Sequence, residues 1–179
     1  MNATYFQFRN ERKKDIENLW KFFESVINYL KDPSIENIEE FSKLFNIAIN
    51  LKNNGTSKIT MALYWISPES FLNLDNRSIW FIYESGKIPK EVINKLPKIE
   101  TKITAETYLT IIAEIKLYLD SENSKLNNFK DLSYDAYIYS EEVNLQIKED
   151  KIKKEDGLAG QNEEVYHERI QNCEINRKA

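Results

Sequence analysis

The sequence predicts an all-α protein: a single compact bundle of about six or seven helices, followed by a flexible polar C-terminal tail. Apolar residues recur at intervals of three and four over several long segments, which is the period of an amphipathic helix. Between these segments lie short stretches with most of the chain's four prolines and four glycines, residues that interrupt helices. The apolar content of 41% in 179 residues can fill one hydrophobic core.

Charge and cysteine content exclude several classes of protein. The formal net charge is -4 with both signs mixed along the chain, so DNA contact would require a local basic patch. Cys173 is the only cysteine, which excludes an internal disulfide and a cysteine-rich zinc site. The sequence has neither a secretion signal nor an apolar run of the roughly 18 residues that span a bilayer. We therefore expect a cytoplasmic protein without membrane contact.

The first two helices are predicted to form an antiparallel pair. Residues 10–30 carry one apolar face, and residues 35–51 carry another. Asp32 is the expected N-cap of the second helix, with Pro33 at its first position, and Asn53-Asn54-Gly55 ends that helix. The two apolar faces comprise Ile16, Leu19, Trp20, Phe23, Val26, Ile27 and Leu30, then Ile35, Ile38, Phe41, Leu44, Phe45, Ala48 and Leu51.

A dense apolar stretch, LYWISPESFLNLDNRSIWF, covers residues 63–81. A third helix, capped by Thr56 or Ser57, should stop before Pro68 because proline disfavours helix at the preceding residue. A short turn follows, and Asp75 is the expected N-cap of a fourth helix beginning at Asn76. Trp20, Trp65 and Trp80 are all predicted to face the core. The motif residues are Tyr64, Trp65, Pro68, Phe71, Leu74, Asp75 and Arg77.

Three further elements complete the predicted domain. A short amphipathic piece at residues 90–96 lies between two prolines, and a loop follows at residues 98–102. Thr104 should cap a long helix, and Ser133 should cap the last one. The helical domain is expected to cover residues 1–144, and residues 145–179 form a charged, flexible tail in which residues 157–160 break the helix.

No pattern in the sequence indicates catalysis. The glycines lack the spacing of a phosphate-binding loop. His167, the only histidine, falls in the predicted tail, away from any packed partner. Asp75 with Asn73 and Glu69 is the nearest candidate metal cluster, but an aspartate at this position is better explained as a helix cap. We therefore predict a protein that is not an enzyme and that holds no metal or cofactor.

Three groups of cations are candidates for contact with DNA phosphates, at the first helix, around the glycine turn and in the loop between the prolines. Glu11, Asp15 and Glu100 are interspersed among them, so from sequence alone a solvated surface is the favoured interpretation of each group. The candidates are Arg9, Arg12, Lys13, Lys14, Lys52, Lys58, Lys95, Lys98 and Lys102.

Four segments together resemble a known family. They are NERKKDIENLWKFFE (residues 10–24), ALYWISPESFLNLDNR (62–77), ITAETYL (103–109) and LSYDAYIYSEEVN (132–144). They look like the region that precedes the motor in McrB-type AAA+ proteins of modification-dependent restriction systems, which act in phage defence. Proteins of that type have a GTP- or ATP-hydrolysing motor that forms rings and recruits a nuclease, and their upstream regions select the target, often modified DNA.

The resemblance implies a non-catalytic DNA-binding, specificity or accessory module. Its expected partners are duplex DNA, modified or not, and an AAA+ motor or another restriction subunit. The motor and its phosphate loop are absent from this chain, so we expect a fragment or truncated product without autonomous restriction activity. The alternative is a protein interaction or scaffolding domain that does not contact DNA.

Overall fold

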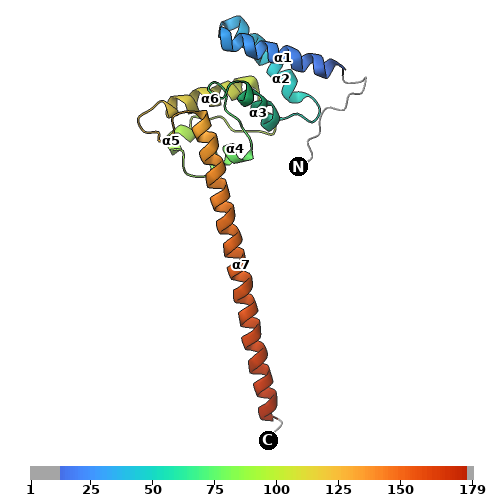
Figure 1. Cartoon of the computed structure of the whole chain (residues 1–179), viewed down its shortest axis with the longest axis vertical. Helices are drawn as coiled ribbons and strands as arrows, with labels where there is room; N and C mark the ends of the chain where they lie inside the picture. The colour runs from blue at the N-terminus through green and yellow to red at the C-terminus, as the bar shows by residue number, and fades with distance from the viewer. Residues whose placement is uncertain (1–12, 177–179) are drawn as a thin grey trace. The chain divides into compact units, whose positions relative to one another are not determined.

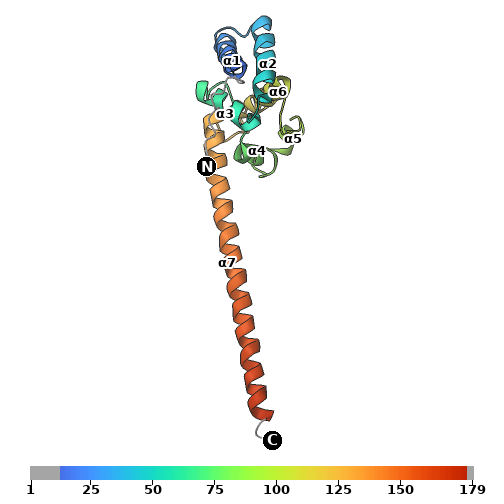
Figure 2. The ribbon, with the colours of Figure 1, turned by 90° about the vertical axis from the view of Figure 1, so that its right-hand side faces the viewer.

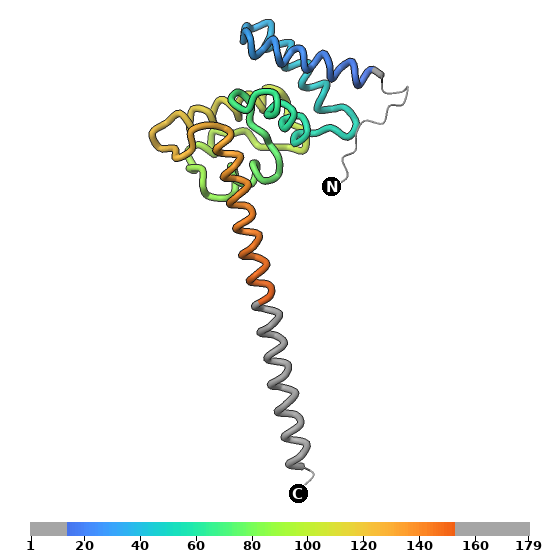
Figure 3. Tube along the Cα trace, viewed as in Figure 1, coloured from blue at the N-terminus to red at the C-terminus, as the bar shows by residue number. Residues whose placement is uncertain are grey.

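The described part of the chain consists of helices joined by irregular segments and contains no strands. This computed structural model describes the backbone of residues 13–176 and the side chains of residues 14–152, the range coloured in Figure 3. Seven helices follow one another within residues 13–176 (Figure 1), which confirms the predicted fold class. They are α1 (Lys13–Lys31), α2 (Ile35–Asn50), α3 (Thr56–Ile66), α4 (Asn76–Tyr83), α5 (Lys90–Ile93), α6 (Ala105–Leu119) and α7 (Phe129–Asn176).

Two units make up the chain, residues 1–137 and residues 138–179. The first contains α1 to α6 and the start of α7; the second is the remainder of α7. The boundary expected after Asn144 stays a prediction. Helix α7 runs through Gly157 and Gly160, where a break was expected, because glycine in a helix costs about 1 kcal/mol without removing the backbone donor. The predicted flexibility of the tail concerns residues that lie mostly beyond the described side chains.

Helices α1 and α2 form the predicted antiparallel pair (Figure 2). The turn between them differs from the prediction, because α2 begins at Ile35 with Ser34 as its N-cap. The backbone N–H of Asp32 donates instead to Asn28 of α1, and its carbonyl accepts from the Asn37 side chain at 2.8 Å. Asp32 therefore ends the first helix. Helix α2 thus begins at residue 35 and not at the predicted residue 33. Its first residue, Ile35, is 78% exposed and lies outside the core.

An aromatic cluster joins α1, α2, α6 and the segment before α4. The ring of Phe41 lies 5.1 Å from Tyr29 and 6.0 Å from Phe71, measured between centroids. Phe45 stacks on Tyr108 at 5.3 Å. Aromatic pairs at such distances contribute about 0.5–1.5 kcal/mol each beyond the area they bury. This cluster is the centre of the core.

The segment between α3 and α4 is buried although it has no regular secondary structure. Residues 71–74 are all buried, so their backbone groups require partners within the protein. The Leu74 N–H donates to the Thr60 hydroxyl at 2.9 Å, and the Leu72 carbonyl accepts from the Tyr108 hydroxyl at 2.8 Å. Two side chains from neighbouring helices thus replace the hydrogen bonds that a helix would supply.

Two of the predicted caps, Asp75 and Thr104, are confirmed. The cap predicted for α3 is wrong, because the helix begins at Thr56 with Gly55 as its N-cap, so neither Thr56 nor Ser57 precedes it. The Asp75 carboxylate accepts from the Ser78 N–H at 2.8 Å, and the Thr104 hydroxyl accepts from the Thr107 N–H at 3.2 Å. Asn46 of α2 adds a long-range cap, since its side-chain oxygen accepts from the first N–H of α6 at 2.9 Å. These bonds fix where α4 and α6 begin.

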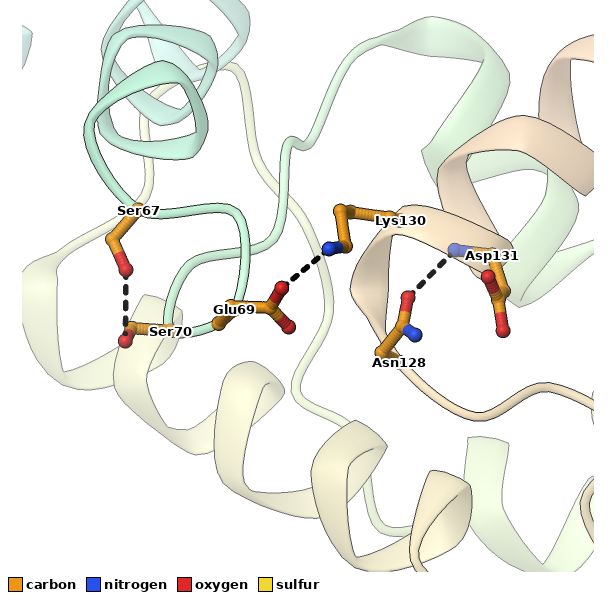
Figure 4. A network of polar contacts seen from close by, with 6 residues as sticks. All are labelled: Ser67, Glu69, Ser70, Asn128, Lys130 and Asp131. Carbon is orange, nitrogen blue, oxygen red and sulfur yellow. Dashed lines mark hydrogen bonds and ion pairs between the residues drawn. The ribbon is translucent and has the colours of Figure 1, made fainter.

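The predicted cap of the last helix is wrong. Helix α7 starts at Phe129, so Ser133 lies inside it; Asn128 is the cap, with its side-chain oxygen 2.9 Å from the Asp131 N–H (Figure 4). Burial of Phe129 and Leu132 requires the earlier start, because both must lie on the inner face of the helix.

Two of the three predicted core tryptophans are on the surface. Trp20 is 63% exposed and Trp65 is 77% exposed, whereas Trp80 is partly buried. Helix α3 is apolar nearly all round, so its sequence does not indicate which face is inside. Leu63, not Trp65, lies in the core.

Candidate functional site

The described residues contain no group of three histidine, cysteine, aspartate or glutamate side chains placed to hold a metal ion. Asp75 caps α4, as described above. Glu69 forms an ion pair with Lys130 of α7, and the hydrogen bond to this carboxylate raises the pKa of Lys130 (Figure 4). His167, predicted to lie in the tail, is outside the residues whose side chains the structure describes. Glu69 and Asp75 of the candidate metal cluster thus have other partners: Glu69 pairs with Lys130, and Asp75 binds the Ser78 N–H.

A hollow lies at the N-terminal end of α3 and is here called the basic hollow. Its walls are residues 53–58 of the glycine turn and the start of α3, residues 99–101 of the loop before α6, and two residues of α4. Its volume is about 400 Å³. The Thr56 hydroxyl joins the walls, because it donates to the Thr101 carbonyl at 3.2 Å and accepts from the Ile103 N–H at 3.4 Å.

The start of α3 has backbone donors available at this hollow. The first N–H groups of a helix have no acceptor within the helix, and Gly55, the N-cap, supplies no side-chain cap. Asn53 turns the chain with a left-handed φ of 67°, and its carbonyl accepts from the Lys58 ammonium at 2.7 Å. Free helix N-termini beside a lysine favour anions such as phosphate.

The fold brings two of the three predicted basic groups to the basic hollow. Lys58 lines it, Lys52 precedes its first wall, and Lys98 and Lys102 flank its second wall. All four are exposed. Residues 52–58 and 98–102 together contain four lysines and one acidic residue, Glu100, in a chain whose net charge is negative. This is the local basic patch that a DNA contact would require.

The remaining basic candidates do not line this hollow. Lys14 is exposed on α1, and Lys95 is exposed after α5. Arg9 and Arg12 lie outside the described residues, as does the side chain of Lys13.

A second hollow, here called the motif hollow, lies along α3 and has a volume of about 210 Å³. Four of the seven motif residues line it. The hollow is bordered by Tyr64 and Trp65 of α3, Asn73 and Asp75 of the following segment, Arg77 of α4 and Tyr137 of α7. Pro68, Phe71 and Leu74 of the motif do not line it; Phe71 and Leu74 are fully buried in the core.

Polar and aromatic contacts organise the motif hollow. The Arg77 guanidinium carbon lies 4.6 Å from the centroid of the Tyr137 ring, a cation–π geometry. The rings of Tyr64 and Trp65 meet edge to face at 6.3 Å. Asn73 is only 3% exposed, and its side-chain oxygen accepts no hydrogen bond from the described residues.

Comparison with known families classifies the chain. A family model described as a domain of unknown function, DUF8425, matches residues 1–139. The chain belongs to this family. No curated protein and no solved structure matches it. Both hollows fall within the residues that the DUF8425 model covers.

Sequence reasoning missed part of both hollows in this DUF8425 domain. The sequence marks Thr56 only as a possible helix cap, although its hydroxyl bridges two segments 45 residues apart. From the sequence, Asn73 is a candidate only as a neighbour of Asp75 in a metal cluster, and Tyr137 is predicted only to lie on the last helix. The one signal for Asn73 in the sequence is its position as a polar residue within the apolar run FLNL, residues 71–74, because a polar side chain buried in such a run needs a partner.

Proposed function

We propose that this DUF8425 protein is a non-catalytic DNA-binding or specificity module of a McrB-type restriction system, acting in the cytoplasm in phage defence. On this proposal an AAA+ motor is supplied by another polypeptide segment or subunit, and the module brings that motor to duplex DNA. The motif segments quoted above support the relationship to McrB-type proteins, and the basic hollow supports the DNA contact.

The observation that carries the proposal is the grouping of lysines with uncapped helix amides. A phosphate at the start of α3 could accept from the backbone N–H groups there and from Lys58, which uses only one of its three N–H donors on Asn53. Lys98 and Lys102, at the two ends of the second wall, could neutralise neighbouring phosphates. Contacts of this kind position a protein on DNA without reading its bases.

Fluorescence anisotropy tests the proposal. The purified chain is titrated into unmodified, methylcytosine-containing and methyladenine-containing duplexes at two salt concentrations. We expect binding that weakens with salt, since each phosphate contact releases condensed counterions. A preference for one modified duplex would identify the module as a target reader. Absence of salt-sensitive binding to every duplex would contradict the proposal.

A protein interaction or scaffolding role is the second candidate. Exposed aromatic side chains at the motif hollow, Trp65 above all, favour it, because aromatic residues are enriched in protein interfaces. Recovery of DNA alone, without protein, in a pull-down with the full chain would count against this candidate.

A further inference from the structure

The motif hollow has a chemistry that DNA phosphates would not use. Its lining includes one carboxylate, Asp75, and one guanidinium, Arg77, so its formal charge is balanced. The Arg77 guanidinium already lies over the Tyr137 ring, which reduces the attraction of this ring for a second cation. A neutral ligand therefore fits better than an anion or a cation.

Trp65 supplies an apolar surface beside this hollow. Its side chain is 77% exposed although tryptophan is mostly buried in folded proteins. The Trp65 indole donates no hydrogen bond to the side chains or backbone of the described residues, so no such bond explains its exposed position. Large exposed aromatic side chains next to a concavity are typical of the anchor points of protein interfaces.

Asn73 supplies an acceptor that lacks a donor. Its side-chain oxygen is shielded from solvent and accepts no hydrogen bond from the described residues, an arrangement that destabilises a fold. The amide can turn about its soft Cβ–Cγ torsion and present the oxygen to the hollow that Asn73 lines. An N–H group of a ligand could then donate to this oxygen.

We propose that the motif hollow binds a neutral peptide segment of a partner protein. An aromatic side chain of that segment packs against Trp65, and an N–H group of the segment donates to the side-chain oxygen of Asn73. A peptide combines a flat apolar group with N–H donors and needs no added cation. A nucleotide carries a phosphate, and the balanced charge of Asp75 and Arg77 offers that phosphate no net attraction.

The test uses the full chain labelled with 5-fluorotryptophan and the probe N-acetyltryptophanamide, which has an indole and amide N–H groups. Trp20, Trp65 and Trp80 give three fluorine NMR signals, and a Trp65→Phe variant assigns the relevant one. A ligand of this size is expected to bind with Kd on the order of 1 mM. We expect the Trp65 signal to shift in a saturable manner while the signal of exposed Trp20 stays unchanged.

Two comparison probes give the contrary outcomes. N-acetylglycinamide has the amide without the ring, and deoxyguanosine monophosphate has a flat base with a phosphate. We expect neither to saturate the Trp65 shift at concentrations that saturate it with N-acetyltryptophanamide. Tighter binding of the nucleotide would overturn the proposal in favour of nucleic acid, and parallel linear shifts of Trp20 and Trp65 would overturn it as non-specific association.

Variants separate the acceptor from the aromatic surface, with saturation-transfer NMR on the probe as readout. Asn73→Leu keeps the side-chain size and removes the oxygen, so binding should weaken about tenfold while the melting temperature does not fall. Trp65→Ala alters an exposed residue, so the chain should fold and lose about tenfold in affinity. Trp20→Ala is the matched control and should bind normally. Unchanged affinity in Trp65→Ala, or in a folded Asn73→Leu, would overturn the proposal.

Discussion

Thr60 offers the sharpest test of how the segment between α3 and α4 is held in the core. Its hydroxyl is fully buried, donates to the Thr56 carbonyl at 2.8 Å and accepts from the Leu74 N–H at 2.9 Å. Thr60→Val keeps the shape and removes the hydroxyl. The Thr56 carbonyl retains its helical partner, whereas the Leu74 N–H is left buried without an acceptor.

The expected cost follows from that unpaired donor. Leaving a buried donor unsatisfied destabilises a protein by about 1–3 kcal/mol. In a chain of this length about 1 kcal/mol lowers the melting temperature by roughly 2–4 °C, so the variant should melt about 2–12 °C below the parent. Urea unfolding followed by circular dichroism measures the free energy directly.

Thr110→Val in α6 is the matched control. The Thr110 hydroxyl also donates to the carbonyl four residues earlier, that of Glu106, but it is exposed and accepts from no backbone N–H of the described residues. The control should change the free energy of unfolding by less than about 0.5 kcal/mol. Equal effects of Thr60→Val and Thr110→Val would refute the reasoning, because they would show that the bond to Leu74 does not stabilise the fold.

Three further changes have expected outcomes. Asp75→Ala should lower the free energy of unfolding by about 1 kcal/mol through loss of the α4 cap and leave DNA affinity in the anisotropy assay unchanged; a loss of DNA binding with full stability would contradict the cap assignment. Burial raises the pKa of Tyr83 to about 12 from its usual value near 10, so the unfolded chain loses this proton first and stability falls between about pH 10 and 12. Tyr83→Phe should flatten that decline in urea titrations, and an identical decline in parent and variant would contradict it. Tyr108→Phe should cost about 1–3 kcal/mol in the same unfolding assay, since the buried Leu72 carbonyl loses its donor, and no loss of stability would count against this bond.

Apolar periodicity and local capping signals were sufficient to predict most helices. The ends set by Pro68, Asp75 and Thr104 need only neighbouring residues, and all three predictions are confirmed. The prediction of Ser133 as the cap of the last helix was wrong because a second residue suited to a cap, Asn128, lies five positions earlier. Only burial of the first helical turn decides between the two.

The candidate sites depend on contacts between distant segments, which periodicity does not specify. Lys58 and Lys98 are forty residues apart, and the Thr56 hydroxyl bonds that bring their segments together are between polar residues without a recognisable motif. Trp65 illustrates the complementary difficulty: in a helix that is apolar nearly all round, only the packing of Leu63 determines which side is inside.

The most direct test of DNA contact at the basic hollow is the salt dependence of binding by a Lys58→Ala, Lys98→Ala double variant. Lys125→Ala, an exposed lysine that lines neither hollow, is the control. With a methylated duplex, the slope of log affinity against log salt should become shallower by about 2 in the double variant and by less than about 0.5 in the control. Equal slopes in the double variant and the parent chain would contradict contact between these lysines and DNA phosphates.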